Sequence, residues 1–424
     1  MPFKLTLDKL IYGGEALGHH EGRTVLVPRV LPGELVEVEE TRTAKGVTRA
    51  RPLRIVTVAP DRVEPPCRYF GECGGCHYQH VNIDRQPEHK REILRETLRR
   101  IGKIVWENEI PVHASNPWNY RNQAQFKISH TAERTELGFY AAESHRLVPV
   151  DECKILSPRL NAAISALRAE VWPQDFAACR EIELLADDKD EKLMLTLHGD
   201  IEPEVAQRLA GHLGKLPGVV SVAVKRDNGF DVFGDPALTY QVEDFRYRVS
   251  PGSFFQVSRY LLAELVQAVT GGVEGTFALD LFAGVGLFSL PLARAFKEVI
   301  AVEGNTIAAA DLAANAQSYQ LSNVRAQGAS LYDFLRRFAR SGPDLVVLDP
   351  PRAGVGEHSL KLLAGLRPAR LHYLSCHPPT LARDLAHLTH LGYTIISIAM
   401  FDLFPQTSHI ECLAQLVRND RKVS

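Results

Sequence analysis

Long hydrophobic runs are missing from this chain of 424 residues. No apolar stretch approaches the roughly 18 residues that a membrane-spanning helix needs, so the sequence predicts no membrane anchor. Residues 1–4 lead directly into an alternating strand pattern that lacks the features of a signal peptide, and low-complexity segments are absent as well. We therefore expect a cytoplasmic protein that folds along its whole length.

An excess of charge of one sign is also lacking. Lys and Arg together number 49 against 51 Asp and Glu, which leaves a net charge of −2. A chain that coats polyanions by bulk electrostatics is strongly positive, so any contact with nucleic acid must use local basic surface. Basic residues gather at 42–54 and at 90–103, and acidic residues interleave with the second group. That interleaving is typical of a solvated helix face with ion pairs three and four residues apart.

The length of the chain allows about two to four domains, and we place their boundaries at 1–58, 59–250 and 251–424. In the first segment, short alternating strands separated by glycine and proline turns predict a small closed β-barrel. The second segment has short mixed elements, with a helix at 86–101, and is expected to be α+β. In the third, continuous apolar strands alternate with helices, which predicts a parallel sheet with helices on both faces and an antiparallel end.

Four cysteines mark the second segment. Cys67, Cys73 and Cys76 are closely spaced, and Cys153 follows at a distance. In a reduced cytoplasm such thiols are metal ligands before they are disulfides. The spacing alone leaves three alternatives open, which are an iron–sulfur cluster, a zinc ion with four thiolate ligands, and a set of unliganded core cysteines.

A glycine-rich turn at 280–286 follows a strand and opens a helix, so Gly284 and Gly286 let the backbone approach a ligand at the helix N-terminus. Glu303 ends the next strand, where a carboxylate can accept hydrogen bonds from both hydroxyls of a ribose. Asp349, followed by two prolines, ends another strand at the carboxyl edge where open α/β sheets bind ligands. Together these features favour an adenosine ligand, although the glycine turn alone would also suit a different dinucleotide-binding fold.

Cys376 ends the fifth strand of the third segment, and Glu411 lies in its last apolar strand. Carbon C5 of a pyrimidine is a poor nucleophile, so its methylation requires a thiolate that adds to C6 and a base that then removes the C5 proton. Methyltransferases that act on nitrogen through an Asp-Pro-Pro motif need neither group. Each residue also has a structural alternative, which is a buried packing role for Cys376 and a salt bridge to an arginine such as Arg383 for Glu411.

The chain resembles the RNA uracil-C5 methyltransferase family, in the branch that carries a TRAM domain and an iron–sulfur cluster and makes 5-methyluridine in 23S ribosomal RNA. The resemblance covers nearly the whole chain, and residues 144–153 look like the segment that holds the fourth cluster ligand. Its most specific segments are 250–256, 280–286, 348–354, 374–384 and 402–411.

This resemblance implies roles for individual residues. Cys376 is implied as the nucleophile and Glu411 as the base of methyl transfer from S-adenosyl-L-methionine to C5 of a uridine in RNA. Arg121 is implied as an RNA contact, and Phe254 as an aromatic ring that stacks on the target base. The implied contacts to S-adenosylmethionine are Gln256, Phe282, Glu303 and Asp349, beside the glycines Gly284 and Gly286. The implied ligands of a [4Fe-4S] cluster are Cys67, Cys73, Cys76 and Cys153.

We thus expect an RNA methyltransferase with a class I, Rossmann-like α/β domain at its C-terminus, an OB-like RNA-binding barrel of the TRAM type at its N-terminus and a mixed α+β iron–sulfur domain between them. The expected substrate is a hairpin or loop of 23S ribosomal RNA, because two additional RNA-facing segments imply a broad footprint. Uracil-C5 methylation of transfer RNA, N-methylation through Asp349 and its prolines, and an inactive binding module are the alternatives. No obligate protein partner is evident.

Overall fold

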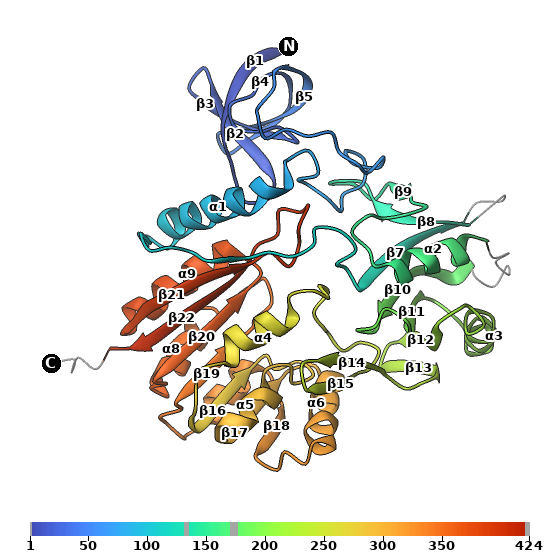
Figure 1. Cartoon of the computed structure of the whole chain (residues 1–424), viewed down its shortest axis with the longest axis vertical. Coiled ribbons are helices and arrows are strands. Elements are labelled where there is room, and N and C mark those ends of the chain that lie inside the picture. The colour runs from blue at the N-terminus through green and yellow to red at the C-terminus, as the bar shows by residue number, and fades with distance from the viewer. Residues whose placement is uncertain (1, 131–134, 170–176, 420–424) are drawn as a thin grey trace.

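The computed structural model describes residues 2–130, 135–169 and 177–419. These residues form a β-barrel near the N-terminus, a central sheet with two helices, and a larger C-terminal sheet flanked by helices (Figure 1). Residue 1, with which the first predicted segment begins, and residues 420–424, with which the third ends, lie outside this description. No helix within the described ranges is long and apolar enough to cross a membrane.

The N-terminal barrel closes in the strand order β1-β2-β3-β5-β4. Its strands alternate as the sequence predicts: in β1 (Phe3–Leu10), Leu5 and Leu7 are buried while Lys4 and Thr6 are exposed. Because the barrel is closed, the first and last strands of this order pair with each other, and their backbone groups are not free to pair with another chain. The other barrel strands are β2 (Glu15–His20), β3 (Arg23–Pro28), β4 (Leu35–Ala44) and β5 (Val47–Thr57).

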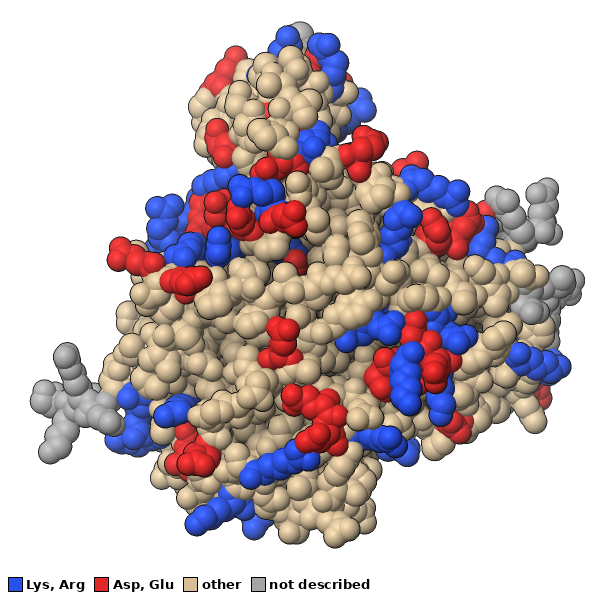
Figure 2. Space-filling view, in the orientation of Figure 1, with Lys and Arg blue, Asp and Glu red and all other residues tan. Residues whose placement is uncertain are grey.

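Helix α1 (Gln86–Ile101) follows the short 3-10 turn η1 (Ile83–Arg85) and has the bounds that the sequence predicts. It lies between the barrel and the C-terminal sheet (Figure 1), and its buried side includes Ile93, Leu94 and Leu98. Blue and red side chains alternate over its outer face (Figure 2), where Arg100 and Glu96 form an ion pair of the predicted i,i+4 type.

The central sheet has seven strands in the order β13-β12-β11-β10-β7-β8-β9, with β11 and β12 parallel and the other neighbours antiparallel. Two helices complete its α+β character, and a separate hairpin, β14–β15, leads into the C-terminal part. The elements are β7 (Gln123–His130), β8 (Thr135–Tyr140), β9 (Leu147–Pro149), α2 (Pro158–Ala169), β10 (Cys179–Ala186), β11 (Leu193–Gly199), α3 (Pro203–Leu213), β12 (Val219–Arg226), β13 (Gly229–Gly234), β14 (Leu238–Val242) and β15 (Phe245–Val249).

The C-terminal sheet has the order β18-β17-β16-β19-β20-β22-β21-β6. The strands from β18 to β20 are parallel, and β22 runs antiparallel between β20 and β21, so the predicted antiparallel end is confirmed. The short strand β6 (Val112–His113) arrives from the preceding segment and pairs in parallel with β21, which is therefore not the edge. The remaining elements are α4 (Leu262–Thr270), β16 (Gly275–Leu281), α5 (Ser289–Ala295), β17 (Phe296–Glu303), α6 (Thr306–Ser318), β18 (Val324–Gly328), α7 (Leu331–Arg337), β19 (Leu345–Leu348), α8 (Glu357–Gly365), β20 (Arg370–Ser375), α9 (Pro378–His390), β21 (Tyr393–Phe401) and β22 (Glu411–Arg418).

One hydrophobic cluster runs from the barrel through α1 into the C-terminal sheet. Leu7 of the barrel, Leu94 of α1 and Met400 of β21 are all fully or almost fully buried members of it. An ion pair between Lys9 and Glu96 adds a polar contact between barrel and helix. The barrel is therefore packed into the protein and is not a loosely tethered arm.

Candidate active site

The parallel strands of the C-terminal sheet bring the predicted site residues to one edge. Asp280 lies near the end of β16, and Glu303 ends β17. Asp349 directly follows β19, and Cys376 directly follows β20. Since β17, β16, β19 and β20 are neighbours in that order, these carboxyl ends stand side by side. This is the edge at which open α/β sheets bind ligands.

The glycine turn after β16 has the backbone that its sequence requires. Phe282, Gly284 and Gly286 have positive φ angles of 68°, 54° and 94°. A Cβ on Gly286 would lie 2.9 Å from Cδ1 of Leu290, so this position has no room for a side chain. A Cβ on Gly284 would meet no described atom within 4 Å, so the turn has open space on that side, where a ligand can approach the backbone.

Glu303 joins this turn to the next strand. Its carboxylate accepts hydrogen bonds from the N–H of Gly284 at 2.8 Å and from the N–H of Asn305 at 2.7 Å. An ionised carboxylate offers about four acceptor positions, so two remain for ribose hydroxyls. The two backbone bonds also fix the orientation of the carboxylate toward the open side of the turn.

Two buried carboxyl groups lie next to each other between the turn and Cys376. Burial and, to a smaller extent, the negative charge of Asp280 raise the pKa of Asp349 to about 7. Burial likewise raises the pKa of Asp280 to about 7, although a hydrogen bond of 2.5 Å from Oγ of Ser289 acts against the change. Nε2 of Gln256 lies 3.4 Å from Oδ2 of Asp349 and brings the segment before α4 over the same edge. Such acidic, apolar surroundings favour a positively charged ligand group, and the sulfonium of S-adenosylmethionine is such a group.

Cys376 and Glu411 meet across the pairing of β20 with β22. Ser375 pairs with Cys412 in this antiparallel ladder, so the next position sets Cys376 opposite Glu411. Glu411 is 3% exposed, and its Oε1 has no hydrogen-bond partner among the described atoms. Burial raises the pKa of Glu411 well above its usual range, and the charge of Asp349 adds to the effect. Cys412 is buried in the core as predicted.

Cys376 itself is half-buried, and burial raises the pKa of its thiol to about 11. The charges of Glu411 and Asp349 contribute to this raised pKa after burial, while Arg352 opposes them. The alternative salt bridge between Glu411 and Arg383 is wrong, because Arg383 pairs with its neighbour Asp384. Both predicted catalytic groups thus face the ligand edge without a competing structural partner.

The two residues predicted to contact RNA lie at the same edge. The ring of Phe254 is 62% exposed, two residues before Gln256. The backbone of Arg121 forms a bridge with Ser258, so Arg121 is held beside this segment. The charge of Arg121 also contributes to lowering the pKa of His409, which stands two residues before Glu411.

Sequence reasoning missed the groups that hold the loop in front of Glu411. Nζ of the fully buried Lys90 lies 2.7 Å from Oδ1 of Asp402 and 2.9 Å from the carbonyl oxygen of Phe404. The Gln86 side chain donates to Oε1 of Gln406 at 2.9 Å and accepts from the Gln406 N–H at 2.9 Å. Helix α1 therefore fixes residues 402–406 through buried polar contacts. Polar residues on the otherwise apolar face of α1 were the sequence signal that could have indicated these contacts.

The four predicted cluster cysteines come together in the central part. Cys67, Cys73, Cys76 and Cys153 line one cavity of about 260 Å³. Burial raises the pKa of the thiols of Cys76 and Cys153 to about 12 and about 11, and the N–H of Gly75 donates to Sγ of Cys73 at 3.4 Å. Within the part of the chain that the structure describes, no three or more His, Cys, Asp or Glu residues are placed to hold a metal ion. Cys179, which stood outside the motif, is a buried core residue.

This sheet, its glycine turn and the acidic groups at its strand ends define a class I S-adenosylmethionine-dependent methyltransferase. Residues 82–419 match the model of the tRNA (Uracil-5-)-methyltransferase family, and the chain belongs to this family of RNA-modifying enzymes.

Relatives span the whole chain. An uncharacterized RNA methyltransferase of Aquifex aeolicus is 35% identical over 99% of both chains. The 23S rRNA (uracil(1939)-C(5))-methyltransferase RlmD of Alkalilimnicola ehrlichii is 33% identical over 98% of this chain and 97% of that one. Among solved structures, the Pyrococcus abyssi tRNA (uracil-54, C5)-methyltransferase in complex with S-adenosyl-L-homocysteine is 26% identical, with a TM-score of 0.76 over 98% of this chain and 100% of that chain.

Proposed function

We propose that the enzyme methylates C5 of one uridine in 23S ribosomal RNA, with Cys376 as nucleophile and Glu411 as base. The observation that carries the chemistry is the register of β20 and β22, which sets these two side chains opposite each other beside Asp349. Nitrogen methylation would leave both groups without a role.

The thiolate of Cys376 adds to C6 of the uracil ring, and the electron pair of the C5–C6 double bond moves to C5 and O4. Carbon C5 then takes the methyl group from the sulfonium of S-adenosylmethionine, and S-adenosylhomocysteine leaves. The carboxylate of Glu411 then removes the proton from C5, the double bond re-forms, and Cys376 departs as thiolate. A raised pKa suits Glu411 as a base, since it makes the carboxylate a stronger proton acceptor.

The cofactor site comprises residues that the fold gathers at the carboxyl edge. Glu303 holds the ribose, and the open side of Gly284 lets the backbone contact the ligand. Buried carboxyl groups beside Gln256 suit the cationic end, because a neighbouring positive charge favours their ionised form. The full proposed set is Gln256, Phe282, Gly284, Gly286, Glu303 and Asp349.

Phe254 and Arg121 bind the flipped target nucleotide. Turning a base out of its stack costs a few kcal/mol, and stacking on an aromatic ring returns about 1–3 kcal/mol. The exposed ring of Phe254 is available for such a contact. Because the two energies are comparable, further RNA contacts must select the substrate, and we assign them to the barrel, as a TRAM-type module, and to the central part.

Three domains, 1–58, 59–250 and 251–424, divide these tasks in a cytoplasmic enzyme. The closed barrel ends at Thr57 and hairpin β14–β15 ends at Val249, which supports both boundaries.

The four cysteines hold a [4Fe-4S] cluster with a structural or RNA-docking role. Their common cavity supports this, because cysteine thiolates are the ligands that iron–sulfur clusters take. Metal analysis of protein purified without oxygen should find four irons per chain, bound by Cys67, Cys73, Cys76 and Cys153. Stoichiometric zinc without iron would contradict the proposal.

The chemistry is tested with RNA that carries 5-fluorouridine at the target. Fluorine cannot be removed as a proton, so the methylated adduct with Cys376 should survive denaturing electrophoresis. Cys376→Ala should give no adduct, and Glu411→Gln should accumulate one even on ordinary RNA. Cys179→Ala, which removes a distant buried thiol, is the matched control. Methylation by Cys376→Ala would exclude this mechanism.

Transfer RNA is the second candidate substrate, because the Pyrococcus abyssi relative named for it covers 98% of this chain. The relatives named for 23S ribosomal RNA favour the ribosomal substrate. Unmodified 23S ribosomal RNA and transfer RNA should be offered side by side with labelled S-adenosylmethionine. Label confined to transfer RNA would overturn the ribosomal assignment and leave the chemistry intact.

A further inference from the structure

The loop between β1 and β2 reaches from the barrel to the catalytic edge. It is a tight turn, closed by hydrogen bonds from the Ile11 N–H to the Glu15 carbonyl at 2.9 Å and from the Gly14 N–H to the Ile11 carbonyl at 3.2 Å. A Cβ on Gly14 would lie 3.0 Å from Cβ of His77 and 3.3 Å from Cβ of Ser408. The tip of this loop is therefore packed against the segment that leads to Glu411.

Tyr12, in this turn, stands beside the nucleophile. Its ring meets the ring of His377 edge-on, with centroids 5.2 Å apart and planes at 89°, and His377 directly follows Cys376. The ring also packs against the hydrophobic cluster that joins the barrel, α1 and the C-terminal sheet. Tyr12 thus reaches the catalytic centre from a domain that sequence reasoning assigned to distant RNA contacts alone.

The phenol of Tyr12 lies among the charged groups of the site. Burial raises the pKa of Tyr12 to about 12; Arg352 lowers it, and Cys376, Cys412 and Glu411 raise it. The hydroxyl therefore stays protonated at neutral pH and can donate a hydrogen bond.

We propose that Tyr12 forms one wall of the target-uridine site, so that the barrel completes the active site. Its ring limits where the base can lie relative to Cys376, and its hydroxyl donates a hydrogen bond to the base. Tyr12 is then a positioning residue for the thiolate addition, and the inference rests on the proposed uracil-C5 chemistry. It predicts that even a substrate too short to reach the outer barrel surface depends on Tyr12.

The test uses the full chain and a single-stranded oligonucleotide of about five nucleotides with one uridine. Tyr12→Ala should lower kcat/KM for methylation about tenfold or more, and Tyr12→Phe should lower it less while keeping the wild-type melting temperature. The rate of covalent adduct formation with the 5-fluorouridine version should fall in parallel. Phe3→Ala is the matched control, because Phe3 is a barrel ring that stacks on a histidine, His20, away from the site.

The possible outcomes separate this inference from the proposed function. Suppose that the wild-type enzyme is active and that Tyr12→Ala and Phe3→Ala have equal activity, whether normal or reduced. That result would overturn this inference and leave the proposed function intact. A wild-type enzyme that makes no 5-methyluridine on any RNA would overturn the proposed function and the inference with it. A loss specific to the two Tyr12 variants, on the short substrate as on long RNA, supports the shared site.

Discussion

At the scale of single residues, the reactivity of the site depends on how its surroundings treat negative charge. The Cys376 thiol is partly buried near two carboxyl groups, and its pKa of about 11 leaves little thiolate at neutral pH. Arg352 is the cation that opposes this effect. A positively charged cofactor bound at the same edge would favour the thiolate further, so binding and activation of the nucleophile are coupled.

This coupling predicts the pH dependence of Cys376 alkylation. Below its pKa, the thiolate fraction rises about tenfold per pH unit, so alkylation by iodoacetamide should accelerate by about tenfold for each pH unit between pH 7 and 10. S-adenosylmethionine should shift the curve to lower pH, whereas S-adenosylhomocysteine, which lacks the sulfonium charge, should shift it much less. Peptide mass spectrometry resolves Cys376 from the other cysteines. A rate independent of pH above 7 would show that the thiol is already ionised.

At the scale of elements, helix α1 supports the catalytic loop by a buried ion pair. Lys90→Met would leave the Asp402 carboxylate buried without its partner, at a cost of about 3–5 kcal/mol in the free energy of unfolding. The kcat should fall too, because residues 402–406 lead to Glu411. Urea denaturation and methylation assays measure both effects.

Two controls separate the ion pair from a general effect on the helix. Arg99→Met changes an exposed residue of the same helix and should alter stability little. The double variant Lys90→Met with Asp402→Leu should recover most of the stability, since it removes both buried charges. A double variant as unstable as Lys90→Met would show that the charge pair is not the cause.

The glycine turn after β16 offers a paired comparison at the same scale. Gly286→Ala forces a Cβ against Leu290 at a φ of 94° and should cost about 1–3 kcal/mol in stability. Gly284→Ala is also strained, at a φ of 54°, but its Cβ meets no described atom within 4 Å, so it should cost less stability and mainly weaken S-adenosylmethionine binding, because the methyl enters the ligand's space. Thermal unfolding and calorimetric titration distinguish the two. Equal effects of both variants on stability and affinity would contradict this division.

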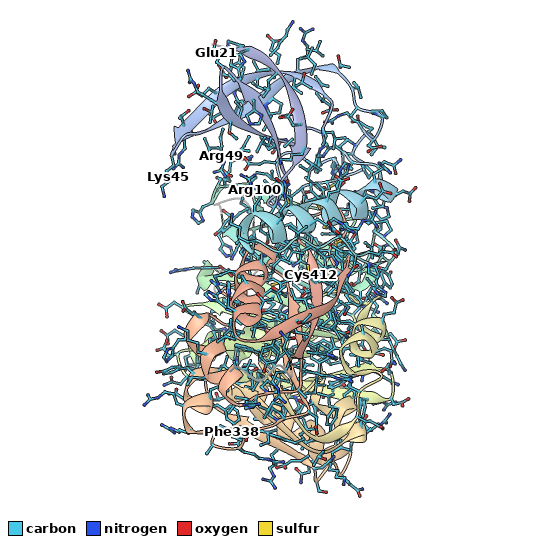
Figure 3. The ribbon with its side chains drawn as sticks, turned by 90° about the vertical axis from the view of Figure 1, so that its left-hand side faces the viewer. Glu21, Lys45, Arg49, Arg100, Phe338 and Cys412 are labelled. Atoms are coloured by element: carbon cyan, nitrogen blue, oxygen red, sulfur yellow. The ribbon has the colours of Figure 1, made fainter. Side chains whose placement is uncertain are left out.

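At the scale of the whole molecule, the barrel belongs to a hydrophobic core that continues through α1 into the catalytic sheet. Removal of residues 1–58 would expose that core, so point variants are the better test of RNA binding by the barrel. Figure 3 labels Lys45 and Arg49 of the barrel and Arg100 of α1 on one side of the protein, above the buried Cys412. These basic residues are candidates for the proposed RNA contacts, although Arg49 also pairs with Glu15 and Arg100 with Glu96.

Neutralising this basic side should weaken RNA binding in a salt-dependent way. Lys45→Ala and Arg100→Ala should each reduce the slope of log affinity against log salt by about 0.7 to 0.9 if the residue contacts a phosphate. The kcat on a short oligonucleotide should stay unchanged. Lys361→Ala, on α8, removes an exposed charge that pairs with Glu357 and serves as the control. If all three variants have the same slope of log affinity against log salt, the RNA does not contact this side of the protein.

The sequence by itself determined the type of the strongly patterned elements and suggested the chemistry that we propose for the site. Continuous apolar runs such as 345–348 predict strands buried on both faces, and the structure confirms them. The glycine turn, Glu303, Asp349 and Cys376 were found by their place at strand ends, because parallel strands end at a common edge. Glu411 was found as an acidic residue in an apolar strand. Less periodic elements escaped notice: the strand Cys179–Ala186 carries helix-forming residues, and helix α3 lay in a segment without a recognised motif.

Only the tertiary structure decided which distant segments meet. Lys90 and Asp402 are separated by 312 residues, and Tyr12 and His377 belong to domains at opposite ends of the chain. Strand β6 contributes two residues to the sheet edge, which is too short for any periodicity. Periodicity and turn chemistry are local properties of the chain, whereas these contacts depend on how folded units pack. The sequence therefore predicted which residues act as nucleophile and base, and the packing of the barrel and α1 decided what surrounds them.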